Sequence, residues 1–127
     1  MDSKVNVLNW FELPVHDMAR AKRFYEAIFG ITMDKQEMMK MDMAFFPYEP
    51  GSGKLAGALV KSGSHKPSPD GVIIYLNGNP DLSVPLAKVE KAGGKIIMPK
   101  TQIAPDIGYM AFLTDTEGNR VALHSQQ

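Results

Sequence analysis

Two side chains that can transfer a proton lie in segments with the alternating pattern of β-strands. Glu12 shares one face of a predicted strand, residues 5–15, with Trp10. His124 lies at the end of another predicted strand, residues 120–124. A buried carboxylate near an imidazole favours the imidazolium, and either group can then move a proton. Each of the two residues is therefore a candidate for acid–base chemistry or for anchoring a substrate, although a structural hydrogen bond or simple solvation would explain either residue equally well.

No other catalytic signature is present. The chain has no cysteine, so it forms no disulfide and offers no thiolate nucleophile or cysteine-based metal site. It contains no glycine-rich phosphate loop, no G-x-S-x-G elbow and no H-E-x-x-H helix. His16 precedes a predicted helix and His65 lies in a polar connection, so both are expected to be exposed to solvent.

The elements that would position these groups form a short module that occurs twice. Each copy reads as a strand, a helix and three further strands, and each helix is followed by glycine, Gly30 in the first copy and Gly93 in the second. Asp17 can cap the first helix, and Gly118 suits the turn between the last two strands. The predicted elements are strand 5–15, helix 17–29 and strands 31–36, 43–48 and 55–60, then strand 72–77, helix 82–92 and strands 95–98, 109–114 and 120–124.

Composition and length limit the partners and the number of domains. The 127 residues include 14 basic and 14 acidic side chains, and no basic patch suited to nucleic acid is evident. No apolar run approaches the roughly 20 residues that cross a bilayer, and no signal segment precedes the first strand. We therefore expect a cytoplasmic protein without a nucleic-acid or membrane partner. Neither module is large enough for a good core by itself, so residues 1–127 should form one domain, with modules at about 1–65 and 66–127.

Residues spread over both modules carry a family pattern. They are Trp10–Pro14 followed by Asp17, then Ala21, Phe24, Tyr25, Phe29 and Gly30, and in the second half Val89, Glu90, Ala92–Lys95, Pro99–Thr101, Asp115, Gly118, Asn119 and Leu123. In this order they resemble the vicinal-oxygen-chelate superfamily of glyoxalases, bleomycin-resistance proteins and extradiol dioxygenases, and most closely its single-domain proteins related to lactoylglutathione lyase. The resemblance implies an α+β fold in which two βαβββ modules, with curved mixed sheets, enclose a cleft.

The resemblance also implies where a metal site would be. Metal-dependent members place a His or Glu ligand on the first and last strand of each module, facing the cleft. These positions correspond here to Trp10, Ala58, Val72 and Ala122, and none of these side chains can bind a divalent metal. We therefore expect a cleft without metal or cofactor, and neither glyoxalase I activity nor extradiol ring cleavage.

The resemblance also implies which residues line the cleft. The expected contacts of a small, partly apolar organic molecule are Trp10, Ala58, Val72 and Tyr109. Glu12 and His124, each two residues beyond a ligand position, would be the catalytic residues. Trp10 is equally suited to core packing, and Tyr109 to a strand edge.

Three functions are compatible with such a cleft, and the sequence leaves open whether the protein is an enzyme. The first is a lyase or isomerase that uses Glu12 as base or His124 as acid. The second is a protein that sequesters a toxic or signalling compound, as bleomycin-resistance relatives do without metal. The third is a metalloenzyme in which Glu12 and His124 from each of two subunits replace the usual ligands.

A methionine-rich segment bears on assembly. Methionine side chains suit adaptable binding surfaces, but they equally fill the irregular gaps of a dimer interface, which is the interpretation we favour. Relatives often complete the cleft by dimerisation, so a homodimer is expected. The residues concerned are Met33, Met38, Met39, Met41, Met43, Phe45, Phe46 and Tyr48.

Overall fold

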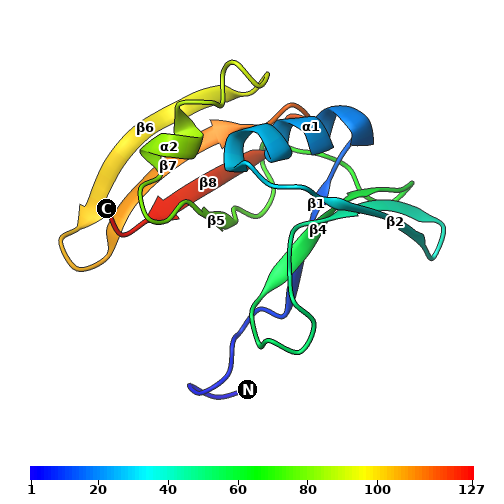
Figure 1. The fold of residues 1–127 in the computed structure, drawn as a ribbon, viewed down its shortest axis with the longest axis horizontal. Coiled ribbons are helices and arrows are strands. Elements are labelled where there is room, and N and C mark those ends of the chain that lie inside the picture. Colours follow the sequence, from blue (N-terminus) through cyan, green and yellow to red (C-terminus); the bar gives the residue numbers. More distant parts are fainter.

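The structure, a computed structural model that describes all 127 residues, contains the two predicted modules one after the other (Figure 1). The first module comprises β1 (Trp10–Pro14), α1 (Met18–Phe29), β2 (Asp34–Met38), β3 (Met41–Phe45) and β4 (Ala56–Lys61). The second comprises β5 (Tyr75–Asn77), α2 (Ser83–Leu86), β6 (Lys95–Ala104), β7 (Gly108–Thr114) and β8 (Arg120–Ser125). The strand orders are β1-β4-β3-β2 and β5-β8-β7-β6, with the first strand of each module parallel to the last and the others antiparallel. The predicted α+β fold of paired βαβββ modules is confirmed.

Helix α1 begins and ends as its sequence predicts. The Asp17 carboxylate accepts a hydrogen bond from the backbone N–H of Arg20 at 3.0 Å, which caps the helix. Gly30 ends it with φ of 64°, a left-handed conformation that glycine adopts without steric cost. The stripe that the helix buries against the sheets consists of Met18, Ala21, Phe24, Tyr25 and Ile28.

The first strand is shorter than predicted. It begins at Trp10 rather than at residue 5, and Val5 and Val7 are 55 % and 78 % exposed. Alternation favours a strand only where a neighbour can exchange backbone hydrogen bonds, and residues 1–9 have no neighbouring strand. They form an arm that extends from the body of the molecule (Figure 1).

The second helix is also shorter than its predicted range, 82–92. Only α2 is α-helical, and the chain then continues in turns whose hydrogen bonds join closer residues, such as Lys88 N–H to Pro85 O at 3.1 Å. Neither helix is long and apolar enough to cross a membrane.

One hydrophobic core serves both modules. Helices α1 and α2 lie on the same side of the two sheets (Figure 1), and a cluster of 18 buried residues from both modules packs between helices and sheets. Its largest fully buried side chains include Phe24 and Tyr25 of α1, Leu59 of β4, and Leu113 and Leu123 of the second sheet. The opposite faces of the two sheets are not covered by a helix and are therefore available for a binding site.

The turn at residues 115–119, between β7 and β8, holds the second module to the first. The Tyr25 hydroxyl donates a hydrogen bond to Asp115 at 2.6 Å, and the Asn119 amide donates to the backbone oxygen of Pro14 at 2.7 Å. Gly118 has φ of 89°, as its predicted place in a tight turn requires. The family pattern of this turn therefore has a structural role, because it fixes β1 and α1 relative to the second sheet.

Candidate functional site

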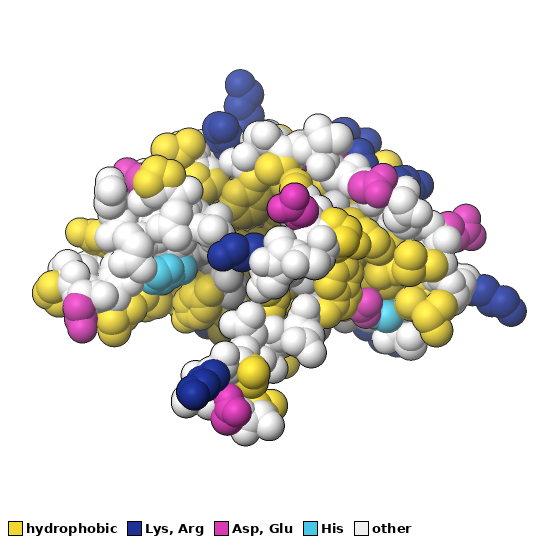
Figure 2. All heavy atoms as spheres, turned by 60° about the horizontal axis from the view of Figure 1, so that its bottom comes forward, with side chains coloured by type: hydrophobic (Ala, Val, Ile, Leu, Met, Phe, Trp, Pro, Cys, Tyr) yellow, Lys and Arg dark blue, Asp and Glu magenta, His cyan; other side chains and the backbone are white.

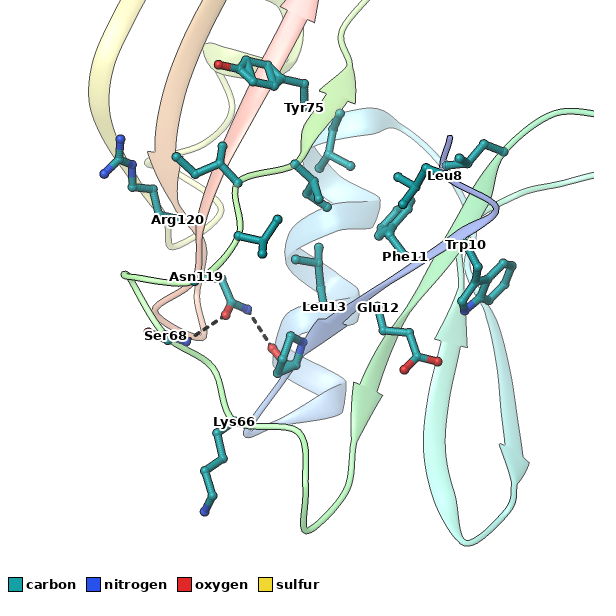
Figure 3. A pocket seen from close by; sticks show the side chains of 17 residues that line it. Leu8, Trp10, Phe11, Glu12, Leu13, Lys66, Ser68, Tyr75, Asn119 and Arg120 are labelled. Atoms are coloured by element: carbon teal, nitrogen blue, oxygen red, sulfur yellow. Dashed lines mark hydrogen bonds between the residues drawn. The ribbon is translucent and has the colours of Figure 1, made fainter. Parts of the chain in front are cut away.

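A groove of about 590 Å³ lies between β1 and the segment that leads into β5 (Figure 3). Strands β1 and β5 are edge strands of their sheets, and both line it. Hydrophobic side chains gather in the middle of this face of the molecule (Figure 2). Ten of the 17 lining residues are hydrophobic, so the groove suits a partly apolar ligand. The main apolar contributors are Leu8, Phe11, Leu13, Leu55, Val72, Ile73, Ile74 and Leu76.

Polar groups stand at the borders of the groove. Asn119 joins its two walls, because its Nδ2 donates to Pro14 O at 2.7 Å and its Oδ1 accepts from the backbone N–H of Ser68 at 3.1 Å (Figure 3). Glu12 stands on the β1 side, whereas Lys66 and Arg120 stand on the opposite side (Figure 3). Charges of opposite sign therefore flank an apolar centre.

The partner of Glu12 differs from the one predicted. Glu12 Oε1 lies 2.8 Å from Nε2 of His65, and the two side chains are 32 % and 20 % exposed. His65 Nδ1 in turn lies 2.6 Å from the hydroxyl oxygen of Ser62. Within the chain Glu12 therefore pairs with His65 and not with His124, and His65 is not the freely exposed residue that its polar surroundings predicted.

The reason for this difference lies in the connection between the modules. Ser62 and His65 pair across a tight turn just after β4, and β4 is the neighbour of β1. The turn therefore brings the imidazole over Glu12. Strand alternation says which residues of a strand share a face, but it says nothing about an irregular segment that folds back onto that face.

His124 and Tyr109 lie outside the groove. His124 Nε2 is 2.8 Å from the backbone oxygen of Ile107, so the imidazole is held by the loop before β7. The Tyr109 ring lies beneath the ammonium group of Lys100, 4.5 Å from the ring centroid, and Lys100 also contacts Asp81 at 2.9 Å. Both predicted site residues belong to strands of the second sheet, and both side chains have partners within the protein.

Trp10 and Ala58 lie on one face of the first sheet, but only Trp10 lines the groove. The Trp10 ring meets Phe45 and Tyr48 edge to face, with centroid distances of 5.5 and 6.0 Å. Ala58 is fully buried and packs with Met43 beneath these rings. A ligand would therefore meet the aromatic side chains before it could reach Ala58.

Val72 precedes β5 rather than belonging to it, and it is 90 % exposed at the border of the groove. Tyr75 is the residue of β5 that pairs with Ala122, and it was not singled out from the sequence. Its ring lies 6.1 Å from that of Phe112, over which the guanidinium group of Arg120 stands at 4.9 Å. The strand begins at Tyr75, three residues later than its predicted start at residue 72. The residue of this strand that lies opposite Ala122 is therefore Tyr75 and not Val72.

The donor set does not fit the metal site of metal-dependent relatives. A divalent ion needs three or four donors that converge within about 2.0–2.6 Å. Glu12 and His65 provide two, and no group of three or more His, Cys, Asp or Glu side chains in the chain is arranged to hold an ion. Trp10, Ala58 and Ala122 cannot contribute a ligand.

Several residues of the site escaped the sequence interpretation. Lys66 and Arg120 supply positive charge, Ser62 holds His65, and Asn119 joins the walls. Only Asn119 gave a signal in the sequence, as part of the turn after Asp115. The others lie in an irregular connection or at a strand end, where no periodic pattern distinguishes them.

Comparison with known proteins agrees with this architecture. The chain is 30 % identical, over 126 aligned residues, to the protein named "Putative glyoxylase CFP32" of Mycobacterium tuberculosis (strain CDC 1551 / Oshkosh), with 91 % of this chain and 44 % of the relative covered. The chain thus spans less than half of that relative. Glyoxalase I from Zea mays superposes with a TM-score of 0.66 at 21 % identity, over 93 % of this chain and 43 % of that one.

A second solved structure matches over its full length. TnmS3, an antibiotic binding protein from Streptomyces sp. CB03234, superposes with a TM-score of 0.64 at 20 % identity, over 99 % of this chain and 100 % of that one. At such identities the superpositions show the fold alone. The sequence itself matches the family pattern over residues 7–123, so the chain belongs to the Glyoxalase/Bleomycin resistance protein/Dioxygenase superfamily.

Proposed function

We propose that this protein binds a small, partly apolar organic molecule, without a metal ion, in the groove between β1 and β5. The observation that carries the proposal is the combination of a mainly hydrophobic groove with a single carboxylate, that of Glu12, held at its border by His65. Apolar surface supplies most of the binding free energy of small ligands, and a few fixed polar groups supply orientation. Trp10 and Val72 would contact the ligand.

Metal chemistry has no part in the proposal. The residues expected to act as displaced ligands already have partners: Glu12 faces His65, and His124 faces the backbone oxygen of Ile107. To bind an ion they would have to give up these hydrogen bonds, and two donors per chain would still have to be completed by a second subunit.

Sequestration is the activity that such a groove supports best, because it requires only apolar contact and one polar anchor. TnmS3, which this chain matches over its full length, is described as an antibiotic binding protein. Proton transfer, as in an isomerase or lyase, is the second candidate. It is favoured by one observation, the contact between the Glu12 carboxylate and the His65 imidazole, since such a pair can accept and return a proton.

A homodimer remains part of the proposal. Met38 and Met39 at the tip of the β2–β3 hairpin are 44 % and 87 % exposed, and the N-terminal arm exposes Val5 and Val7. Apolar side chains gathered at two extensions of a small domain are typical of an interface. A second copy would cover them.

The only tryptophan of the chain, Trp10, lines the groove, so its fluorescence reports binding directly. We expect members of a library of small, partly apolar compounds to quench it and to raise the melting temperature. Ile73→Glu, inside the groove, should weaken binding about tenfold or more, because a charge would replace apolar contact area. Ile103→Glu is the matched control, since Ile73 and Ile103 are 37 % and 39 % exposed and only Ile73 lines the groove.

Two results would contradict the proposal. One is equal binding by both isoleucine variants, which would place the ligand elsewhere. The other is binding that disappears after treatment with a chelator and returns with a divalent metal, which would show that the site requires an ion.

A further inference from the structure

Three side chains form a hydrogen-bonded row that ends on the carboxylate of Glu12. Ser62 Oγ lies 2.6 Å from His65 Nδ1, and His65 Nε2 lies 2.8 Å from Glu12 Oε1. Ser62 and His65 belong to the turn after β4, whereas Glu12 belongs to β1. Both distances are those of well-formed hydrogen bonds.

The surroundings of the Ser62 oxygen decide where its proton lies. The backbone N–H groups of Ser64 and His65 both donate to Oγ, at 3.2 Å each. A hydroxyl has two lone pairs and one proton, so two donors occupy its acceptor capacity and leave the proton to be donated. Nδ1 of His65, at 2.6 Å, is a much closer acceptor than the hydroxyl of Ser64, at 3.2 Å.

The position of this proton determines the state of the imidazole. An Nδ1 that accepts a hydrogen bond carries no proton, so the proton of a neutral His65 must be on Nε2. That N–H points at Oε1 of Glu12. The opposite tautomer would bring the lone pair of Nε2 within 2.8 Å of a carboxylate oxygen, which is repulsive.

We propose that Ser62 and His65 are positioning residues for Glu12, and that they reserve its second oxygen, Oε2, for a ligand that donates a hydrogen bond. The inference rests on the proposed function. Oε1 is held by His65, Oε2 has no partner in the protein, and the side chain remains 32 % exposed. The ligand should therefore carry a hydroxyl, amine or amide N–H beside its apolar part.

The positioning role can be tested without any ligand. Long-range proton–nitrogen NMR correlations at about pH 8, where an ordinary histidine is neutral, show which ring nitrogen of His65 carries the proton. We expect protonated Nε2 and unprotonated Nδ1 in the wild type and in Ser62→Thr, which keeps the hydroxyl. Glu12→Ala should keep this tautomer, because Ser62 still donates to Nδ1, whereas Ser62→Ala combined with Glu12→Ala should give a mixture of tautomers. An Nδ1-protonated His65 in the wild type, or a tautomer mixture in Glu12→Ala alone, would overturn the positioning role of Ser62.

The reserved oxygen is tested with two probes, 2-naphthol and its methyl ether, which differ in one donor group. The wild type should bind 2-naphthol about tenfold more tightly than the ether, since a hydrogen bond to a charged acceptor is retained only by the phenol. In Glu12→Ala the two probes should bind equally. In His65→Phe the preference for 2-naphthol should fall while affinity for the ether stays unchanged, which a purely structural role would not produce.

The outcomes separate the two proposals. Equal affinity of the wild type for both probes would refute the proposal that Oε2 of Glu12 accepts a hydrogen bond from the ligand. The groove would remain a binding site. Binding of neither probe would count against the proposed function and against the reserved oxygen together, and the tautomer measurement would still decide the roles of Ser62 and His65.

Discussion

Arg20 and Glu117, 97 positions apart in the chain, form an ion pair with two hydrogen bonds, at 2.8 and 3.1 Å. The Glu117 side chain is fully buried, whereas that of Arg20 is 45 % exposed. The same carboxylate accepts the backbone N–H groups of His16 and Asp17 at 2.8 and 2.7 Å. Burial raises the pKa of Glu117, but the hydrogen bonds from Arg20, from these backbone groups and from the Thr116 hydroxyl outweigh it and lower the pKa to about 2.

Replacing Glu117 by glutamine should destabilise the protein by about 2–3 kcal/mol, because several hydrogen bonds to a charged, buried acceptor are weakened at once. Urea denaturation measures the change in the free energy of unfolding. Glu90→Gln is the matched control, since Glu90 is exposed and its side chain makes no hydrogen bond. A loss no larger than that of the control would mean that the hydrogen bonds of the Glu117 carboxylate do not help to hold the two modules together.

Stability should fall in acid through the same group. The ordinary pKa of a glutamate is 4.5 and that of folded Glu117 is about 2, so between these values the unfolded chain binds more protons than the folded one. The contribution, on the order of 3 kcal/mol, is present in full above about pH 5 and is lost as the pH falls toward 2. Asp81, whose pKa is also about 2, acts equally in the wild type and in Glu117→Gln. The difference in free energy of unfolding between these two proteins should therefore shrink with acid; a constant difference would contradict the assignment.

Tyr25→Phe should cost about 1–3 kcal/mol, because it leaves a buried carboxylate oxygen of Asp115 with one hydrogen bond fewer. Burial, and then the charge of Asp115, raise the pKa of Tyr25 well above 10, so its hydroxyl remains a donor across the stable pH range. Thermal or urea unfolding gives the cost. Tyr75→Phe, at a half-exposed ring, serves as the control and should leave the free energy of unfolding unchanged within about 0.5 kcal/mol.

Glu12→Gln should keep the melting temperature nearly unchanged and reduce or abolish ligand binding, if Glu12 serves function. The glutamine retains an oxygen that can accept from His65, but it loses the charge that a ligand donor would meet. Melting curves with and without a bound library compound measure both effects. Normal melting together with wild-type affinity would show that Glu12 is not the anchor, and a loss of more than about 1 kcal/mol of stability would indicate a structural role.

Assembly should be dimeric at tens of micromolar. Met39, which is 87 % exposed, lies beyond the body of the sheet, where a second copy would cover it. Met39→Glu should therefore weaken self-association in sedimentation equilibrium, whereas Lys91→Glu, at an exposed position in the turns that follow α2 in the second module, should not. A wild-type protein that sediments as a monomer at these concentrations would contradict the proposal.

Much of the fold follows from short-range patterns. The alternation around Leu13, the helical stripe with Asp17 at its start and Gly30 at its end, and the tight turn at Gly118 each predict their element from neighbouring residues. The two modules and their order could be predicted because most elements can be recognised from such patterns of neighbouring residues. The ends of the first strand and the second helix could not, because a strand needs a hydrogen-bonding neighbour and a helix needs hydrogen bonds that continue beyond its first turn.

The sequence by itself determined that Glu12 stands beside Trp10 on one face of a strand, because side chains two apart on a strand point the same way. Only the tertiary structure decided that the partner of Glu12 is His65. Fifty-three positions separate the two residues, and they meet because an irregular turn after β4 folds over β1. No periodic pattern encodes such a contact: the conformation of a polar connection is set by the hydrogen bonds and packing that it finds once both modules have formed.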